Sequence, residues 1–305
     1  MKMHDDQIDI SDEVARELIV SQFPEWAPLP VRRFESRGTV NAIFRIGGEF
    51  AARFPLRAAD PVAMLRDLEE EAQAIAEFSR HSPVSAPSPV CIGSPGATYP
   101  LPWSVQTWLP GTTALDNDPS RSLEFARDLA ALVAALRLVS TAGRSFKGCG
   151  RGGDLHGHDE WVEASIRQVG PQFVKSQLAE LWNYFRDLPR TSQDAMTHGD
   201  LTPLNILADR GQLVGILDCG GFGPADPSLD VIAGWHLLDD GPREVFRSEL
   251  NCDELEWERS KAWTFEQSLG AVCYYVDSNP AMYNMGCRSL RRILDNTPAR
   301  GLTPP

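Results

Sequence analysis

The first third of the chain alternates between apolar and polar residues, which is the pattern of strands that bury one face. Turn-forming residues at Arg37–Val40 and at Gly47-Gly48 separate the first three alternating runs, so two antiparallel hairpins are expected. A later run ends at the break Pro110-Gly111. The expected strands are VRRFES (31–36), NAIFRI (41–46), EFAARF (49–54), a short strand around Val90, and one within WSVQTWLPG (103–111).

Elsewhere the apolar residues recur at helical spacing. Ser11 and Asp60 each precede such a segment, and their side chains can accept the first free amides of a helix. After about residue 108 the pattern is almost wholly helical. The expected helices are 12–23, 60–80, 122–140, 159–169 and 173–187, then one that Asp226 caps and that runs through Trp235 and Leu238, and more in the last hundred residues.

A strand-rich beginning and a helical remainder predict an α+β protein. Its 305 residues exceed the usual size of a single hydrophobic core, so two lobes are expected, divided near residue 108. The apolar content of 42% is enough to fill both lobes.

The composition of the chain indicates which cellular compartment and which kinds of partner to expect. No apolar run is long enough to cross a bilayer and the N-terminus is acidic, so a cytoplasmic protein is expected. The six cysteines are scattered without a C-x-x-C pair, which indicates neither a zinc site nor a disulfide framework. A net charge of −13 argues against nucleic acid and anionic membranes as partners, and it is compatible with a cationic one.

The stretch His198–Asp230 holds the polar groups that phosphoryl transfer needs. Asp200 and Asn205 lie in one polar loop, at an offset that lets both side chains converge on a point. LVGIL (213–217) is a predicted buried strand that ends at Asp218. A carboxylate that accepts a hydroxyl proton, with an amide and a second carboxylate that hold Mg²⁺ on nucleotide phosphates, is the minimal set for moving a γ-phosphoryl group to an alcohol.

The order H-G-D-x-x-x-x-N, I-L-D and D-P-x-x-D resembles the aminoglycoside phosphotransferase family, the small-molecule branch of the kinase-like fold. The resemblance covers nearly the whole chain, from the turn at Gly38 to the terminal helices. It implies a two-lobed protein-kinase-like fold. Residues 1–108 would form the nucleotide-binding lobe, with an antiparallel sheet, and residues 109–305 the larger, mainly helical lobe that carries catalysis and substrate binding.

The resemblance also gives roles to the residues of the motif. Asp200 would be the catalytic residue that orients the acceptor hydroxyl and takes its proton. Asn205 and Asp218 would hold Mg²⁺. His198 and Asp230 would support the loop, Asp230 by bonding its backbone amides.

Two positions depart from the pattern of the family. No lysine lies between Lys2 and Lys147, so Arg53 on the third predicted strand takes the place of the phosphate-binding lysine. Cys219 stands where an aromatic residue is usual, which puts the local packing in doubt.

Glu71 lies on the apolar seam of its helix, where a carboxylate needs a partner, so an Arg53–Glu71 pair is expected. The alternatives are a surface ion pair for Arg53 and a water-exposed rim position for Glu71.

Two further segments would meet the nucleotide. Backbone amides at Gly38 and the hydroxyl of Thr39 can cradle phosphate oxygens, although an ordinary hairpin has the same sequence. The backbone of Gln106, Thr107 and Trp108 matches the hinge of the family, where it would bind the edge of the base. An interior strand with nothing bound is the alternative there.

These expectations describe a phosphotransferase that uses ATP or GTP with Mg²⁺ and a small-molecule hydroxyl acceptor. An aminoglycoside is favoured because the chain has 42 acidic against 29 basic residues. A macrolide or a metabolite alcohol remains an alternative, and so does a nucleotide-binding module without catalysis. The residues expected to line the acceptor site are Asp239, Glu266, Tyr274 and Asp277.

Overall fold

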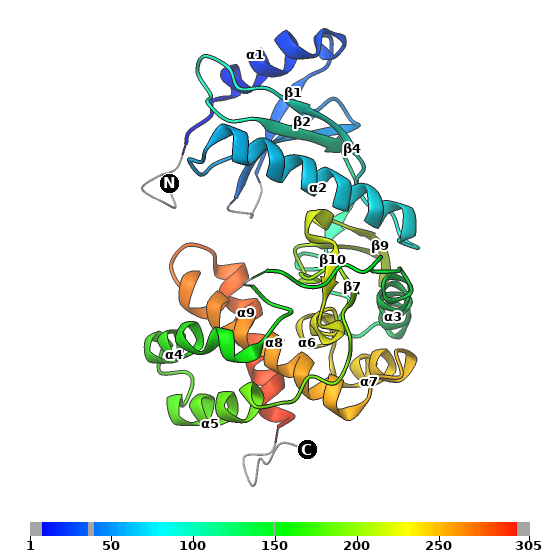
Figure 1. Ribbon diagram of the computed structural model, residues 1–305, viewed down its shortest axis with the longest axis vertical. Coiled ribbons are helices and arrows are strands. Elements are labelled where there is room, and N and C mark those ends of the chain that lie inside the picture. The colour runs from blue at the N-terminus through cyan, green and yellow to red at the C-terminus, as the bar shows by residue number, and fades with distance from the viewer. Residues whose placement is uncertain (1–7, 36–39, 149, 298–305) are drawn as a thin grey trace. The chain divides into compact units, whose positions relative to one another are not determined.

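The computed structural model of the chain describes residues 8–35, 40–148 and 150–297 (Figure 1). These residues form two compact units, each with its own core. The assignment of nucleotide binding to the lobe 1–108 and of catalysis to the lobe 109–305 remains a prediction. The first unit extends to Arg80 and adds Ser85–Pro110 and Asp218–Gly220; the second comprises His81–Val84, Gly111–Leu217 and the residues from Gly221 onward.

A five-stranded antiparallel sheet is the centre of the first unit. Gly47 has a φ of 57° and supplies the left-handed residue of the turn between the second and third strands. The strands expected from the alternation are present, although the run 103–111 ends as a strand at Thr107. Across the sheet the order is β1 (Val31–Phe34), β2 (Asn41–Ile46), β3 (Phe50–Pro55), β5 (Trp103–Thr107) and β4 (Pro89–Gly93).

One face of this sheet forms the hydrophobic core of the unit. Its strands contribute Phe54 and Trp103, whose rings stack with their centroids 4.6 Å apart. Helix α1 (Asp12–Gln22) covers them with Leu18 and Ile19. Burial of side chains of this size stabilises the fold by about 1.5–3 kcal/mol each, so this face anchors the sheet.

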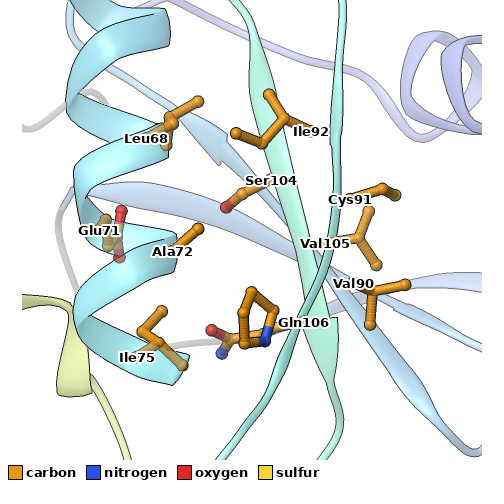
Figure 2. Close-up of a pocket in the computed structure, with 11 residues that line it drawn as sticks. Leu68, Glu71, Ala72, Ile75, Val90, Cys91, Ile92, Ser104, Val105 and Gln106 are labelled. Atoms are coloured by element: carbon orange, nitrogen blue, oxygen red, sulfur yellow. The ribbon is translucent and has the colours of Figure 1, made fainter. Parts of the chain in front are cut away.

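The opposite face carries polar side chains and lies toward α2 (Pro61–His81) (Figure 2). Arg53 of β3 pairs in register with Ser104 of β5, so both side chains project to this side. The helix begins where expected, because the carboxylate of Asp60 accepts the amide of Ala63 at 2.9 Å. The alternation of the strands thus separates an apolar core from a polar face.

Helices make up most of the second unit, and α8 lies among them (Figure 1). This helix is buried on nearly all sides over most of its length, because four other helices pack against it. Those four are α4, α5, α6 and α9. The helices of the unit are α3 (Leu123–Arg137), α4 (Asp159–Gln168), α5 (Lys175–Arg186), α6 (Ile232–Leu237), α7 (Asp240–Glu249), α8 (Glu254–Tyr274) and α9 (Pro280–Asp295).

The loop that contains His198-Gly199-Asp200 connects two small antiparallel sheets of this unit. The strand expected at 213–217 is β9, and it pairs with the strand that follows the loop. One sheet consists of β6 (Thr112–Thr113), β8 (Ile206–Asp209) and β9 (Gln212–Ile216), and the other of β7 (Ala195–Thr197) and β10 (Gly223–Ala225).

The helix expected to start at Asp226 differs in the structure. Asp226 caps only a short 3₁₀ turn, Pro227–Leu229, and α6 begins at Ile232. The carboxylate of Asp226 also accepts a buried bond from Arg259 of α8, at 2.9 Å from Nε. Asp230 lies in the break, and its carboxylate accepts two amides of the loop before β8. Nonlocal hydrogen bonds have therefore replaced a continuous helix.

Among the helices that the structure describes, none is both long and apolar enough to cross a membrane.

Candidate active site

The loop between β7 and β8 is folded by two tight turns. Gly199 has a φ of 82°, which favours glycine. The Thr202 amide donates to the carbonyl of Asp200 at 2.8 Å, and the Asn205 amide donates to the carbonyl of Thr202 at 3.0 Å. These turns bring the side chains of Asp200 and Asn205 together, the convergence that their offset predicts.

The amide group of Asn205 is oriented by Asp200. Its Nδ2 donates both to the Asp200 carboxylate Oδ2, at 2.8 Å, and to the Asp200 carbonyl, at 2.9 Å. Because an amide nitrogen has only two hydrogens, both donors are used. The Oδ1 of Asn205 is thereby turned away from Asp200, as a carbonyl oxygen that a hard cation can use.

Asp230 and His198 support this loop by hydrogen bonds to its backbone amides. The carboxylate of Asp230, 1% exposed, accepts the amides of His198 and Gly199, both at 2.8 Å. Burial raises the pKa of Asp230, while His198 and the two amides oppose that rise. The ring of His198 accepts the Asp200 amide at Nδ1, 3.2 Å away, and its Nε2 lies 2.9 Å from the carbonyl of Leu217. Both residues therefore bond the backbone of the loop or of the segment beside it, and their supporting role in catalysis remains a prediction.

Asp218 follows the end of β9 after one intervening residue, Leu217. The Leu217 amide donates to the carbonyl of Asn205 at 2.7 Å, so the residue before Asp218 is tied to the loop. Asp218 itself has a φ of 58°, a left-handed conformation that costs a residue other than glycine about 1 kcal/mol or more. Its side chain is 51% exposed. Such an outlier is common at functional sites, where the surrounding structure enforces it.

Arg53 joins two carboxylates within the first unit. Its Nη1 donates to Glu71 at 2.7 Å and its Nη2 donates to Asp218 at 3.0 Å, which uses the planar fork of the guanidinium. Burial by itself would lower the pKa of Arg53, but Glu71 and Asp218 together raise it. The Arg53–Glu71 pair expected from the helical seam is therefore present. A lysine, with a single nitrogen, would not span the two carboxylates in this way.

Two partners of Asp200 were missed at the level of sequence. Gln267 on α8 donates from Nε2 to Asp200 Oδ1 at 2.6 Å, and Arg151 donates to the same oxygen at 3.1 Å. Gln267 lies within a helix whose pattern indicates only burial, and Arg151 lies in a glycine-rich segment. Neither position carries a local signal, because the contacts span 67 and 49 residues of sequence.

A cavity of about 240 Å³ lies within the first unit, between α2 and the strands β4 and β5 (Figure 2). Leu68, Ala72 and Ile75 of the helix turn toward the strands, and Ser104 and Gln106 of β5 turn toward the helix. Glu71 also lines this space. The polar face of the sheet is thus incompletely packed beside the Arg53–Glu71 pair.

Some of the residues expected to bind the nucleotide already have their backbone amides hydrogen-bonded within the protein. The Thr107 amide donates to the carbonyl of Ser88 at 2.9 Å, and the Trp108 amide donates to the carbonyl of Glu49 at 2.6 Å. Gln106 lies beside Arg53, with its Oε1 3.5 Å from Nη1. The amides of Thr107 and Trp108 in the expected hinge are therefore bonded within the first unit. The two residues of the first hairpin turn, Gly38 and Thr39, lie outside the described residues.

The four residues expected at the acceptor site are not gathered into one group by the contacts of the structure. Glu266 is buried and lies 3.1 Å from His158 Nδ1, and this hydrogen bond raises the pKa of His158. Asp239 accepts from Arg292 at 2.7 Å. Tyr274 packs edge-on against a neighbouring tyrosine, and Asp277 is exposed in the turn after α8.

Within the described ranges, no three His, Cys, Asp or Glu side chains form a cluster that could hold a metal ion by themselves. Mg²⁺ is commonly bound by one or two protein oxygens together with substrate phosphates and water. The oxygen of Asn205 and the half-exposed carboxylate of Asp218 are oxygen donors of this kind. The donors fit Mg²⁺ and suit softer metals poorly.

Comparison with solved structures identifies the fold as protein-kinase-like. The GDP and kanamycin complex of APH(2")-IIia is 19% identical, with a TM-score of 0.68 over 93% of this chain and 99% of that chain. The GDP complex of wild-type aminoglycoside 2'-phosphotransferase-IIIa is 18% identical, with a TM-score of 0.70 over 94% and 100%. The macrolide 2'-phosphotransferase MphH from Brachybacterium faecium, as apoenzyme, is 18% identical, with a TM-score of 0.57 over 90% and 97%.

The family follows from the sequence. The profile of the phosphotransferase enzyme family matches residues 31–263, which is most of the chain. The chain therefore belongs to this family, as the motif order predicts. None of the curated proteins matches it.

Proposed function

We propose that this protein moves the γ-phosphoryl group of ATP or GTP to a hydroxyl group of a small molecule. The observation that carries the proposal is the carboxylate of Asp200, which accepts hydrogen bonds from Asn205 and Gln267 on a loop anchored by Asp230. A carboxylate oriented in this way presents oxygen lone pairs that can accept a proton from a hydroxyl group. The family and the neighbours support phosphotransfer as the reaction class.

The reaction is a direct displacement. The acceptor oxygen forms a bond to the γ-phosphorus, the bond to the β-phosphate oxygen breaks, and the hydroxyl proton passes to Asp200. Asn205 and Asp218 hold Mg²⁺, which when bound supplies charge neutralisation to the phosphate oxygens. Positioning of the two reactants contributes much of the acceleration, because the transfer itself needs little covalent help from the protein.

The nucleotide meets the first unit. Arg53, steadied by Glu71, binds its phosphates, and the segment Gln106–Trp108 binds the base. Gly38 and Thr39, which lie outside the described residues, remain candidates to contact the phosphates. Neighbouring structures are complexes with GDP or ADP, and these nucleoside diphosphates support a nucleotide donor. Since the amides of Thr107 and Trp108 are already bonded, we assign recognition of the base to the carbonyl groups of this segment. The protein acts in the cytoplasm, where ATP, GTP and Mg²⁺ are abundant.

For the acceptor we propose an aminoglycoside first. Kanamycin, gentamicin and streptomycin appear in complexes of the neighbours, and the chain carries a net charge of −13. An acidic protein raises the local concentration of a polycation. Asp239, Glu266, Tyr274 and Asp277 remain the candidates to line its site.

A macrolide or a metabolite alcohol is the second candidate, and two contacts favour it. Arg151 places a positive charge 3.1 Å from Asp200, which repels a polycation. Glu266 and Asp239 are already engaged by His158 and Arg292. Two macrolide phosphotransferases also share the fold, with TM-scores of 0.57 and 0.58. A binding module without catalysis is disfavoured, because Asp200 and Asn205 remain paired as catalysis requires.

The decisive experiment compares acceptors at two ionic strengths. Phosphorylation of kanamycin and of erythromycin is measured with ATP and with GTP at low salt and at about 0.3 M salt, where exposed charges are strongly screened. We expect turnover of kanamycin with a KM that rises several-fold in salt. Turnover of erythromycin alone, insensitive to salt, would replace the aminoglycoside by the second candidate. Absence of turnover with both and with a panel of alcohols would contradict phosphotransfer.

A further inference from the structure

A chain of buried and partly buried hydrogen bonds leads from α9 to Asp200 through two other helices. Ser289 Oγ of α9 lies 2.8 Å from His236 Nδ1 of α6, and His236 Nε2 lies 2.9 Å from Gln267 Oε1 of α8. Gln267 Nε2 then donates to Asp200 Oδ1 at 2.6 Å. None of these three helical residues belongs to the motif around Asp200.

We infer that Gln267, held in one orientation by His236, is a positioning residue that fixes the carboxylate of Asp200 for proton transfer. The inference rests on the proposed function for its catalytic meaning. The hydrogen-bond geometry on which it is built does not depend on the identity of the acceptor.

The direction of every bond follows from the charge on Asp200. A carboxylate only accepts hydrogen bonds, so Gln267 must present its NH₂ group to Asp200 and its oxygen to His236. His236 must then donate from Nε2, and its Nδ1 must accept the hydroxyl hydrogen of Ser289. The opposite direction would place the oxygen of Gln267 2.6 Å from a carboxylate oxygen, which is repulsive.

The surroundings of His236 enforce this single tautomer. His236 is 1% exposed and Ser289 is fully buried, so neither can exchange its partner for water. Burial lowers the pKa of His236 to about 3, and the nearby charges of Arg151, Arg288 and Arg292 act in the same direction. The ring is therefore neutral and carries one N–H, which the chain assigns to Nε2.

The arrangement limits the rotation of the Asp200 carboxylate. The terminal torsion of an aspartate is otherwise broad, so one anchor would leave the carboxylate plane poorly defined. Here Asn205 binds Oδ2, and both Gln267 and Arg151 bind Oδ1. Donors on both oxygens, of which Gln267 is itself fixed by a buried histidine, hold the lone pairs toward one direction and reduce the reorganisation that proton transfer requires.

Variants of His236 test the link directly. In His236→Gln the new amide nitrogen takes the place of Nε2 and keeps a donor to Gln267, whereas His236→Asn keeps a partner for Ser289 only. We expect kcat to stay within about threefold of wild type in His236→Gln and to fall about tenfold in His236→Asn, with the KM for nucleotide unchanged in both. Equal losses in the two variants, or losses confined to KM, would overturn the inference.

A double-mutant cycle separates coupling from general damage. Gln267→Met removes the bond to Asp200 at similar size, and we expect kcat to fall about tenfold. Adding His236→Asn should cause little further loss, because its effect passes through Gln267. Additive losses would overturn the inference. The matched control is Gln212→Met on β9, whose Nε2 donates to Glu124 at an exposed site, and it should leave kcat unchanged.

A measurement without turnover distinguishes this inference from the proposed function. Nitrogen NMR of ¹⁵N-histidine-labelled protein should show His236 as the Nε2–H tautomer at neutral pH, assigned by the loss of its signals in His236→Gln. Gln267→Met should shift those signals. A Nδ1–H tautomer, or signals that Gln267→Met leaves unchanged, would overturn the inference. If the tautomer is as expected while no acceptor is phosphorylated, the positioning stands and the proposed function fails.

Discussion

The Arg53 cluster of the first unit and the Asp200 loop of the second differ in the charge of the groups that hold them. Arg53 donates hydrogen bonds to two carboxylates, those of Glu71 and Asp218. Asp200 accepts from the neutral donors of Asn205 and Gln267 and from the charged Arg151. The first arrangement depends more on Coulomb attraction, which falls off slowly with distance, whereas hydrogen bonds between neutral donors and a carboxylate require close distances and aligned angles.

The supports behind the two groups differ as well. Asp230 and His236, which support the Asp200 loop, are both buried, so water does not compete for their hydrogen bonds. Glu71 borders a cavity of about 240 Å³, and the side chain of Asp218 is half exposed. Well-packed interiors resist movement, and underpacked regions permit it. The comparison indicates a rigid setting for Asp200, the proposed proton acceptor, and a more adjustable one for Arg53, the proposed phosphate-binding residue.

The largest effect is expected at Asp200. Asp200→Asn keeps the size of the side chain and removes the carboxylate, so kcat should fall about 10²-fold or more while nucleotide binding persists. Steady-state kinetics and calorimetry of nucleotide binding measure the two quantities. Asp209→Asn, at an exposed position in the same unit, is the matched control and should leave both unchanged. Turnover near the wild-type rate in Asp200→Asn would remove this residue from the role.

The pH dependence of the free energy of unfolding should reveal the burial of the neutral His236 ring. The pKa of His236 is lowered from 6.5 to about 3 by burial, so between these values the unfolded chain binds a proton that the folded chain does not. The free energy of unfolding should therefore fall as the pH falls, by about 2 kcal/mol between pH 6.5 and pH 5. This contribution should be absent in His236→Gln. Urea unfolding of both proteins across this range measures it, and parallel curves would contradict the burial of a neutral ring.

The Arg53 cluster should show a smaller but coupled effect. Arg53→Ala should weaken ATP binding by about tenfold and Glu71→Gln by less, because in our proposal the arginine contacts the phosphates and the glutamate only steadies the arginine. The double variant should be weaker than Arg53→Ala by less than the Glu71→Gln loss. Additivity within about 0.5 kcal/mol would show that the two residues act independently. Asp12→Asn, which breaks the exposed pair with Arg33, is the control.

Several features of the site could be predicted because they depend on short stretches of sequence. The offset between Asp200 and Asn205 brings them together within one loop, and the strand before Asp218 follows from five apolar-rich residues. Helical spacing places Glu71 on a packing face, where its carboxylate needs a partner, and a cation on the facing strand can supply it. The Arg53–Glu71 pair was therefore predictable from periodicity and burial.

Other features lack any local signal. The acids Asp239 and Glu266 look available in the sequence, yet Arg292 and His158 engage them from segments far along the chain. The helix expected to extend from Asp226 is broken, because Asp226 and Asp230 bind a distant helix and a distant loop. Which acids remain available to a substrate is decided by pairing, which periodicity does not reveal.

By itself the sequence determined the alternation of the sheet, the helical remainder, the family and the polar residues of the motif, because each depends on spacing within a few residues. Only the tertiary structure decided that a chain of hydrogen bonds leads from Asp200 through Gln267 and His236 to Ser289. These residues come from three helices, and hydrogen bonds between helices depend on how the helices pack, which no short stretch of sequence encodes.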